Sequence, residues 1–502
     1  MNKPISTPNN IDDYGSSYSK NEEELKREFA RSYFTLIGFS ICYAFIAGLF
    51  CIIEPACAGG GIAEVKAYLN GVNVREAVRM KVLITKMLSM SFASASGLPI
   101  GREGPMIHCG SIVGAAVSQG RTKLLGWDTS WTKFQDLRND RSKRDFVTFG
   151  AAAGVTAAFQ APIGGIMFTL EEGASFWSTS LTFRAFFCAL MTQLTYEIIT
   201  SIKTMSYTSN PEYAQQGPYQ DDDDYIPASL LDASDSFNLL SENLAFLPFG
   251  SFKNTPKPQP VELIFFILIG ASGGLLGALF NYICEKMYHL RRKYKAVHYR
   301  MLELLTLTFL WNTISFVLPM INRNGWCQQI PTDSANWTET QYSLVSSLQQ
   351  FHCPTGQYNQ LASLFLTSPD VAMQQFFHFP SIEGYAANAF NTNALVLFFL
   401  PYFFFAAVSF GSFCPTGLFI PTLMAGAAYG RIWGHILNVL SDEDALITFS
   451  NPGTYAVIGA AAMLGMIFMI TTSTICKLII IIIRWYVTYD NNRNSYVNRG
   501  MW

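Results

Sequence analysis

The segment Tyr33–Ile53 reads YFTLIGFSICYAFIAGLFCII and contains no charged residue. An α-helix needs about 20 apolar residues to cross the hydrocarbon core of a bilayer, so this stretch predicts a membrane-spanning helix. Three further apolar stretches have a similar length, namely Leu263–Ile283, Leu304–Met320 and Ala394–Phe410. Four such segments predict a polytopic, all-α membrane protein.

The composition of the whole chain agrees with a membrane location. Half of its 502 residues are hydrophobic and only 14% are charged, against roughly 25% in soluble globular proteins. The 34 Lys and Arg against 36 Asp and Glu leave a net charge of -2, so no basic field is present to hold a nucleic-acid backbone. The ten Cys form no CxxC or Cys/His cluster, and we therefore expect neither a metal site nor another cofactor.

Basic residues indicate which loops face the cytosol. They concentrate in Gly120–Asp145 and Glu285–Arg300, and cytosolic loops are the ones enriched in Lys and Arg. The long segment Ile321–Asn393 contains Arg323 as its only Lys or Arg. We therefore expect residues 321–393 to form a luminal or extracellular loop.

This loop carries two features of an oxidising compartment. The triplet Asn336-Trp337-Thr338 is a glycosylation sequon with its acceptor at Asn336. Cys327 and Cys353 lie in the same loop and suit a disulfide bond. The alternative of two unpaired thiols stays open at this point.

The whole chain divides into three parts, one of which contains a further polar stretch. Residues 1–30 are polar and are expected to form a cytosolic leader, and residues 31–464 the transmembrane domain. The Pro-, Ser- and Asp-rich stretch Ser201–Pro260, with its run Asp221–Asp224, predicts a solvated loop. Residues 465–502 form an atypical tail.

Between the simple apolar stretches lie segments broken by Gly and Pro, namely Val82–Ile100, Phe146–Leu170 and Gly417–Gly430. Broken helices survive in a membrane only where they are buried in protein or line an aqueous cavity, so a transport site is expected there. An internal echo, GAAAG at Gly150–Gly154 and GAAAM at Gly459–Met463, predicts two repeats of opposite topology. Close helix packing alone is the alternative reading.

Three glycine-rich segments predict an anion site. They are Gly59–Ala63 (GGGIA), Gly101–Pro105 (GREGP) and Gly417–Pro421 (GLFIP). Each is expected to start or interrupt a helix, where unpaired N–H groups and a partial positive charge attract anions. Three such ends, from distant parts of the sequence, can surround one anion without a fixed cation and so let it leave again.

Three ionisable positions stand near these segments. Glu103 would be costly among helix ends in a membrane unless functional, so it predicts a gate that moves away when protonated; a surface Glu in a turn is the alternative. The pair Glu171-Glu172 follows an apolar run and is either a proton relay or a solvated helix end. His108 is expected to be a packing residue. No nucleophile triad or phosphate loop is present, so we do not expect an enzyme.

Taken together and in this order, the motifs resemble the CLC family of chloride channels and proton-coupled chloride transporters. The resemblance runs from about Glu54 to Leu464. Within the family, the motifs look like those of the intracellular, endosomal and lysosomal branch of eukaryotic members. The segments that carry it are GREGPMIHCGS (101–111), KRDFVTFGAAAGVTAAFQAPIGG (143–165), LEEGASFW (170–177) and CPTGQYNQLASLF (353–365).

This resemblance implies CLC architecture with inverted repeats, and chloride/proton antiport with Glu103 as gate and Glu172 as proton relay. It also implies a homodimer with one pore per subunit, embedded in lipid of an endosomal, lysosomal or other intracellular membrane. A passive voltage-gated chloride channel and a truncated, non-transporting subunit are the alternatives. The anion-binding positions it implies are Gly60, Gly61, Ile62, Arg102, Glu103, Gly104, Leu418 and Phe419.

The chain departs from the family at several places. Gly60 stands where most members have Ser or Pro, and Ala63 replaces the usual Pro, so one hydroxyl contact to the anion is missing and the preference between chloride and nitrate is open. The pattern after Leu464 does not continue, no CBS domains are matched, and members have at least one more membrane helix before the first span. The chain is therefore expected to be truncated at both ends.

Overall fold

The computed structural model describes most of the transmembrane region and parts of the loops. The described residues are 11–72, 74, 77–120, 123–124, 127–128, 137–174, 177–208, 260–294, 296–321, 323–330, 344–345, 347–354, 356–378, 390–440 and 450–467. Asn336, the run Asp221–Asp224 and the tail from residue 468 onward lie outside them.

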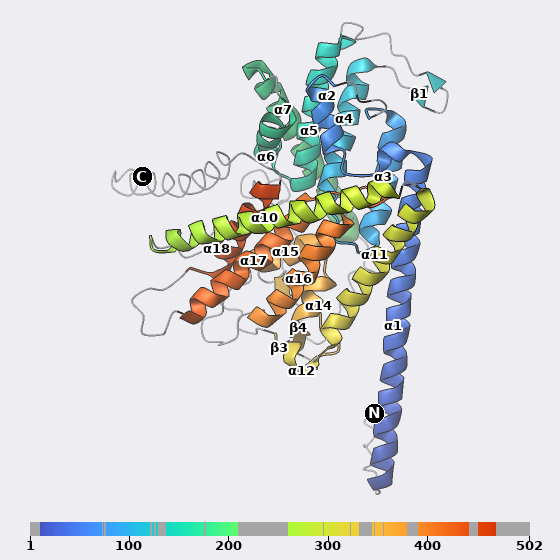
Figure 1. Cartoon of the computed structure of the whole chain (residues 1–502), viewed down its shortest axis with the longest axis vertical. Helices are drawn as coiled ribbons and strands as arrows, with labels where there is room; N and C mark the ends of the chain where they lie inside the picture. The colour runs from blue at the N-terminus through green and yellow to red at the C-terminus, as the bar shows by residue number, and fades with distance from the viewer. Residues whose placement is uncertain are drawn as a thin grey trace.

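The described chain is almost entirely helical (Figure 1). The first half contains α1 (Ile11–Ile53), α2 (Ile62–Leu69), α3 (Met80–Ala95), α4 (Glu103–Gln119), α5 (Asp140–Phe159), α6 (Pro162–Phe168), a π-helical turn η3 (Thr169–Gly173) and α7 (Thr179–Thr208). The second half contains α10 (Glu262–Lys293), α11 (Val297–Val317), α12 (Arg323–Trp326), α14 (Gln360–Phe365), α15 (Pro369–His378), α16 (Thr392–Ser409), α17 (Phe419–Leu440) and α18 (Pro452–Ile467). Short 3₁₀ turns cover Pro55–Cys57 and Leu318–Met320.

Within the described ranges, four helices are long and apolar enough to cross a membrane, and they cover Phe29–Ile53, Glu262–Lys293, Val297–Met320 and Thr392–Ser409. Each overlaps one of the four stretches that the sequence predicts, so the prediction of a polytopic all-α protein is confirmed. Large apolar side chains on their outer faces are exposed, such as Phe34 (70%) and Leu275 (74%). Such faces suit a lipid surrounding, since lipid tails are as apolar as these side chains.

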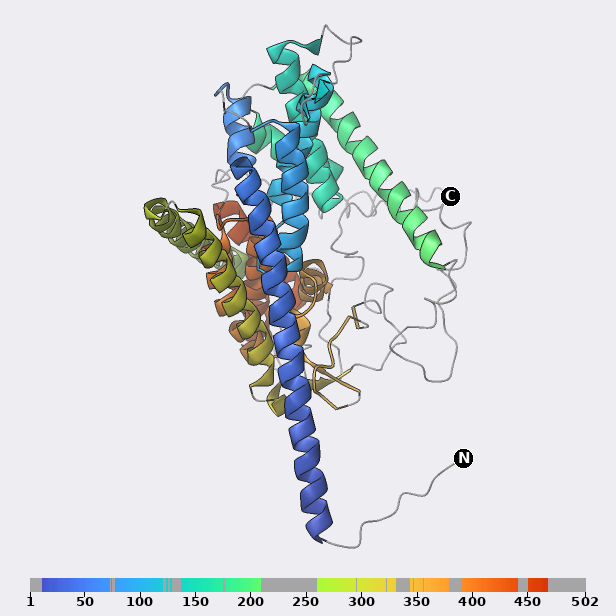
Figure 2. The ribbon, with the colours of Figure 1, turned by 90° about the vertical axis from the view of Figure 1, so that its right-hand side faces the viewer.

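Helix α1 runs antiparallel to α11. The Phe29 ring lies 5.0 Å from Phe316 and 6.5 Å from His352 of the 321–393 segment, while Gly48 packs against Met301 near the start of α11. Figures 1 and 2 show the same arrangement, with the beginning of α1 toward the end of the molecule that holds α12 and β3 and away from β1.

This arrangement bears on the predicted sidedness of the leader and of residues 321–393. The beginning of α1 lies beside the 321–393 segment, so the leader and that segment fall on the same side of the membrane. The leader therefore cannot be cytosolic if residues 321–393 are luminal. Both therefore stay predictions of sidedness, and only one of them can hold.

Two helix pairs repeat the same packing in the two halves. In the α4–α5 pair, a Cβ added to Gly150 would meet the carbonyl oxygen of Gly110 at 2.2 Å. In the α17–α18 pair, a Cβ added to Gly459 would meet the carbonyl oxygen of Gly426 at 2.4 Å. The GAAA echo therefore marks the helix that packs against a motif-bearing helix in each half, where only small residues let the backbones approach so closely.

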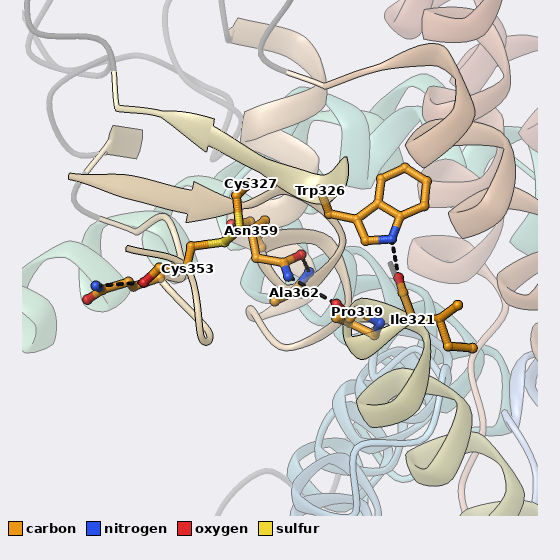
Figure 3. The surroundings of a disulfide bond; sticks show 9 residues. Pro319, Ile321, Trp326, Cys327, Cys353, Asn359 and Ala362 are labelled. Carbon is orange, nitrogen blue, oxygen red and sulfur yellow. Dashed lines mark hydrogen bonds between the residues drawn. A yellow bond between two sulfur atoms is a disulfide. The ribbon is translucent and has the colours of Figure 1, made fainter. Parts of the chain in front are cut away.

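The segment after α11 is held by a disulfide (Figure 3). Cys327 and Cys353 are bonded, with their Cα atoms 5.7 Å apart. The strands β3 (Cys327–Gln329) and β4 (Gln357–Asn359) pair antiparallel with Cys327 opposite Asn359. The Asn359 side chain accepts from the Ala362 N–H at 3.1 Å and donates to the Pro319 carbonyl at 3.1 Å, which ties this segment to the end of α11.

A second two-stranded ribbon, β1 (Lys123–Leu124) with β2 (Trp127–Asp128), lies in the basic loop at the opposite end of the molecule (Figure 1). The apolar core lies between the two halves, where α16 and α17 bury most of their side chains. Within this core the Phe398 ring stacks on Tyr402 with centroids 5.0 Å apart. Helix α16 also packs on α17, where the Phe399 ring lies 6.1 Å from the ring of Tyr429.

Candidate anion and proton site

The three glycine-rich motifs meet in space. A Cβ added to Gly104 would lie 3.4 Å from the Cα of Gly60 and 3.5 Å from the Cα of Gly417. Gly101 and Gly417 exchange two backbone hydrogen bonds, of 2.9 and 2.7 Å, in an isolated antiparallel bridge. Backbones can approach this closely only where side chains are missing, which is the physical reason for glycine at these positions.

Each motif stands at the beginning of a helix. Gly61 is the N-cap of α2 and has a left-handed φ of 81°, which glycine adopts without strain. The first backbone bonds of the three helices are donated by Val65, Met106 and Thr422. The N–H groups before them, in the first turn of α2, α4 and α17, precede the intrahelical ladder and are the kind of donors that bind anions.

Glu103 lies at the centre of this convergence. It is the first residue of α4, it is 1% exposed, and neither carboxylate oxygen makes a hydrogen bond. Its own N–H and that of Ile420 in α17 act on the carboxyl group from nearby without reaching hydrogen-bond geometry. The carboxylate folds back over Gly101, where an added Cβ would meet its Oε2 at 2.3 Å. The side chain therefore fills the space between two helix N-termini.

The other predicted anion-binding positions divide into two groups. Ile62 and Phe419 are the first residues of α2 and α17, and Leu418 directly precedes α17. The Phe419 ring packs on Phe159 with centroids 4.4 Å apart. Arg102 instead points away from Glu103, because its guanidinium forms an exposed ion pair of 2.5 Å with Asp370 of α15. Only its backbone takes part in the convergence.

Gly60 has little room for a side chain. A Cβ there would meet the Thr416 carbonyl oxygen at 3.0 Å, which is tighter than most van der Waals contacts. A side chain with a hydroxyl group at this position would therefore push the two backbones apart.

Glu172 lies apart from this centre, in the π-helical turn after α6. Its carboxylate accepts a hydrogen bond of 3.0 Å from Lys66 Nζ, and the Glu172 side chain is 17% exposed against 51% for Lys66. Lys66 stands one helical turn beyond the N-terminus of α2. Helix α2 thus connects the Glu172 ion pair to the anion motif.

One pair of residues at this site was not predicted. Lys86 of α3 is fully buried and hydrogen-bonded to His108 of α4, whose ring packs against Gly61. The signal in the sequence was a single lysine inside the apolar stretch Val82–Ile100. Among the residues that the structure describes, no group of His, Cys, Asp or Glu could hold a metal ion.

Comparisons with known proteins agree on one family. The family described as voltage gated chloride channel matches residues 41–484. The H(+)/Cl(-) exchange transporter 7 of Mus musculus is 36% identical over 446 residues, which cover 88% of this chain and 48% of that protein. The chloride channel protein CLC-c of Arabidopsis thaliana is 30% identical and is covered to 52%. The chain thus spans about half the length of these curated relatives.

Two solved structures share the fold. A crystal structure of a eukaryotic CLC transporter superposes with a TM-score of 0.55 at 20% identity, covering 91% of this chain and 62% of that one. A slow cyanobacterial Cl-/H+ antiporter gives a TM-score of 0.54 at 18% identity, covering 86% and 75%. At these identities the likeness concerns the fold alone.

Proposed function

The chain belongs to the voltage-gated chloride channel family, and from this premise we propose that it exchanges chloride for protons across a membrane. The observation that carries the proposal is the Glu103 carboxyl group, which is buried without a hydrogen-bond partner between the N-termini of α4 and α17. Intramembrane carboxyl groups of this kind are expensive and are kept for function.

The anion and the Glu103 carboxylate compete for the same donors. The first turns of α2, α4 and α17 present N–H groups to one small region, since Gly60, Gly104 and Gly417 bring their backbones together. Such donors bind a carboxylate or a chloride ion equally well. Protonation removes the charge of Glu103, so the side chain leaves and an anion takes its place.

Protons would reach Glu103 from Glu172 by a path separate from that of the anion. Glu172 is half-buried on the side of η3 that faces α2 and is held by Lys66. A passive channel would use Glu103 and ignore Glu172, so this residue separates the two functions. The names of the relatives, an H(+)/Cl(-) exchange transporter among them, support exchange.

Two finer parts of the proposal concern assembly and location. We propose a homodimer in which each subunit works alone, since every residue of the convergence comes from one chain. The motifs resemble those of the intracellular branch and support an endosomal or lysosomal membrane. A tagged chain found only at the plasma membrane would contradict this location.

The deciding experiment measures proton movement driven by a chloride gradient in liposomes that contain the purified 502-residue chain. We expect the wild type to move protons uphill. Glu172→Gln should retain chloride flux and lose most of the proton flux, because the relay can no longer bind a proton. Glu171→Gln is the matched control, since this neighbouring carboxylate is exposed and should leave coupling unchanged.

Two other outcomes would contradict the proposal. Unchanged coupling in Glu172→Gln would contradict the proposed proton path through Glu172. A wild type that conducts chloride but moves no protons uphill would be a channel. A well-folded wild type that moves neither ion would be a non-transporting subunit. Co-expression with a longer relative would then reveal it as a modulator of that relative's current.

A further inference from the structure

The last turn of α10 contains one buried arginine. Arg291 is 8% exposed, whereas the two residues that follow it, Arg292 and Lys293, are exposed. Its guanidinium group donates to two carbonyl oxygens at the end of α16, that of Val408 at 2.5 Å and that of Phe410. Carbonyl groups at a helix end lack partners within their own helix, and a cation there also meets the negative end of the helix dipole. Arg291 therefore caps α16 from another helix.

A carboxylate fixes the direction of this guanidinium group. Arg291 Nε donates to Oε1 of Glu303 in α11 at 2.7 Å, and Glu303 is half-buried. All three nitrogens of the guanidinium group thus have an acceptor, one on α11 and two at the end of α16. Charge-assisted hydrogen bonds of this kind combine strength with a defined geometry. Arg291 thus fixes α10, α11 and α16 to one another at one point.

The chain turns sharply directly after this cap. Gly411 has a left-handed φ of 73°, which glycine adopts without strain. A Cβ added to it would lie 3.3 Å from Nη1 of Arg291, so the turn packs against the guanidinium group. The Gly411 N–H donates to the Thr416 hydroxyl oxygen at 3.1 Å, within the connection between α16 and α17, residues 410–418. Arg291 therefore holds the beginning of this connection in place.

The same connection ends in one anion motif and contacts the two others. The Cys414 carbonyl oxygen accepts from the Gly59 N–H at 3.1 Å, and Gly417 exchanges two backbone hydrogen bonds with Gly101. The relative positions of the three helix starts thus depend on where residues 410–418 lie. A site made of backbone dipoles selects its ion by the number and the spacing of those dipoles, so a displaced connection changes which anion fits.

We propose that Arg291 is a positioning residue that determines how strongly the anion site prefers chloride over nitrate. It fixes the connection 410–418 at its beginning, and this connection sets the spacing of the N–H donors around the anion. Chloride is a small sphere and nitrate is wider and planar, so a tightly held site favours chloride and a loosened site favours it less. The inference rests on the proposed anion transport. Arg291 acts through the connection and not by contact with the anion.

The test compares the binding of chloride and of nitrate to the purified protein in detergent, measured by isothermal titration calorimetry. Arg291→Lys keeps a positive charge beside Glu303, but a lysine ammonium cannot reproduce the planar fork to two carbonyl groups. We expect chloride binding to weaken about tenfold, the effect typical of removing a group that orients ion ligands. Nitrate binding should weaken less, so the preference for chloride falls. Arg292→Lys is the matched control, because Arg292 is the exposed neighbour, and both affinities should equal those of the wild type.

A second variant keeps the test decisive if Arg291→Lys does not fold. Glu303→Gln leaves an oxygen acceptor for Arg291 Nε but removes the charge that orients the guanidinium group, so the preference for chloride should fall by a smaller factor. A preference equal to that of the wild type in folded Arg291→Lys, or in Glu303→Gln when Arg291→Lys is unfolded, would overturn the proposal and leave Arg291 a purely structural cap. A wild type that binds neither anion would overturn the proposed function as well.

Discussion

At the scale of single residues, the contact with Gly101 determines where the Glu103 side chain lies. The carboxylate folds over the α-carbon of Gly101, and any side chain there would meet Oε2 at 2.3 Å. The other two close atoms, the Gly417 carbonyl oxygen and Pro421 Cδ, are both 3.1 Å away. Of these three groups, the flexible Glu103 carboxylate is therefore the one that a side chain at Gly101 would displace most easily.

Gly101→Ala should hold the gate open. The new methyl group displaces the Glu103 carboxylate from the helix ends, so chloride flux in liposomes should rise while its coupling to protons falls. Glu103→Gln is the comparison, because it removes the charge without the displacement, and its chloride flux should no longer depend on pH. Flux and coupling like those of the wild type in Gly101→Ala would mean that the carboxylate rests elsewhere.

Other residue roles were predicted from the sequence and differ in how far the structure supports them. Glu103 was singled out because a carboxylate among glycine-rich helix starts is costly in a membrane, and the structure buries it there. Arg102 was grouped with the anion site by its place in the motif, but its side chain reaches Asp370. Adjacent residues on a helix point in different directions, and which neighbour each meets depends on an element far away in the sequence.

At the scale of helices, the α4–α5 and α17–α18 pairs share one packing rule. In each pair the helix that begins at an anion motif lies backbone to backbone against the helix that carries the GAAA echo. Contacts of 2.2 and 2.4 Å from an added Cβ to a carbonyl oxygen leave no space for any side chain. The GAAA echo thus indicates both close packing and an internal repeat, although the sequence analysis treated these as alternatives.

Gly150→Ala should separate α4 from α5. The added Cβ meets the carbonyl of Gly110 at 2.2 Å and cannot be relieved by a rotamer change, so we expect a loss of about 1–3 kcal/mol, as for other overpacked sites. This loss of stability is measured as a lower unfolding temperature of the protein in detergent. Gly270→Ala in α10 is the matched control, since nothing lies within 4 Å of its added Cβ.

The unfolding temperature of the Gly270→Ala control should rise, because alanine favours a helix over glycine by up to about 1 kcal/mol. Equal unfolding temperatures for Gly150→Ala and the wild type would contradict the backbone contact. The same comparison with Gly459→Ala tests whether the second half obeys the same rule.

At the scale of the whole molecule, the disulfide closes the segment that follows α11. Cys327 and Cys353 are 26 residues apart in sequence, and a loop of that length is stabilised by about 3 kcal/mol when it is cross-linked. Cys353→Ser should lower the unfolding temperature accordingly. A reducing agent should lower that of the wild type but leave the variant unaffected, and an effect of the reductant on the variant would contradict this assignment.

The sidedness of the two ends is a second property of the whole molecule. An epitope tag placed before Phe29 and one placed in the Gly120–Asp145 loop should be on opposite sides of the membrane, since α1 crosses once between the 321–393 segment and the basic turn. Protease protection in sealed vesicles measures this. If the protease digests both tags, the leader is cytosolic, as predicted from the sequence.

The four membrane helices, the three helix starts and the position of Glu103 at one of them could be predicted from the sequence alone. These depend on neighbours in the chain, because apolar length, glycine and proline act within a few residues. The folded arrangement alone shows that Gly60, Gly104 and Gly417 meet, that His108 lies between Lys86 and Gly61, and that Phe29 lies beside His352. Segments hundreds of residues apart leave no local signal of their contact, since packing of whole helices brings them together.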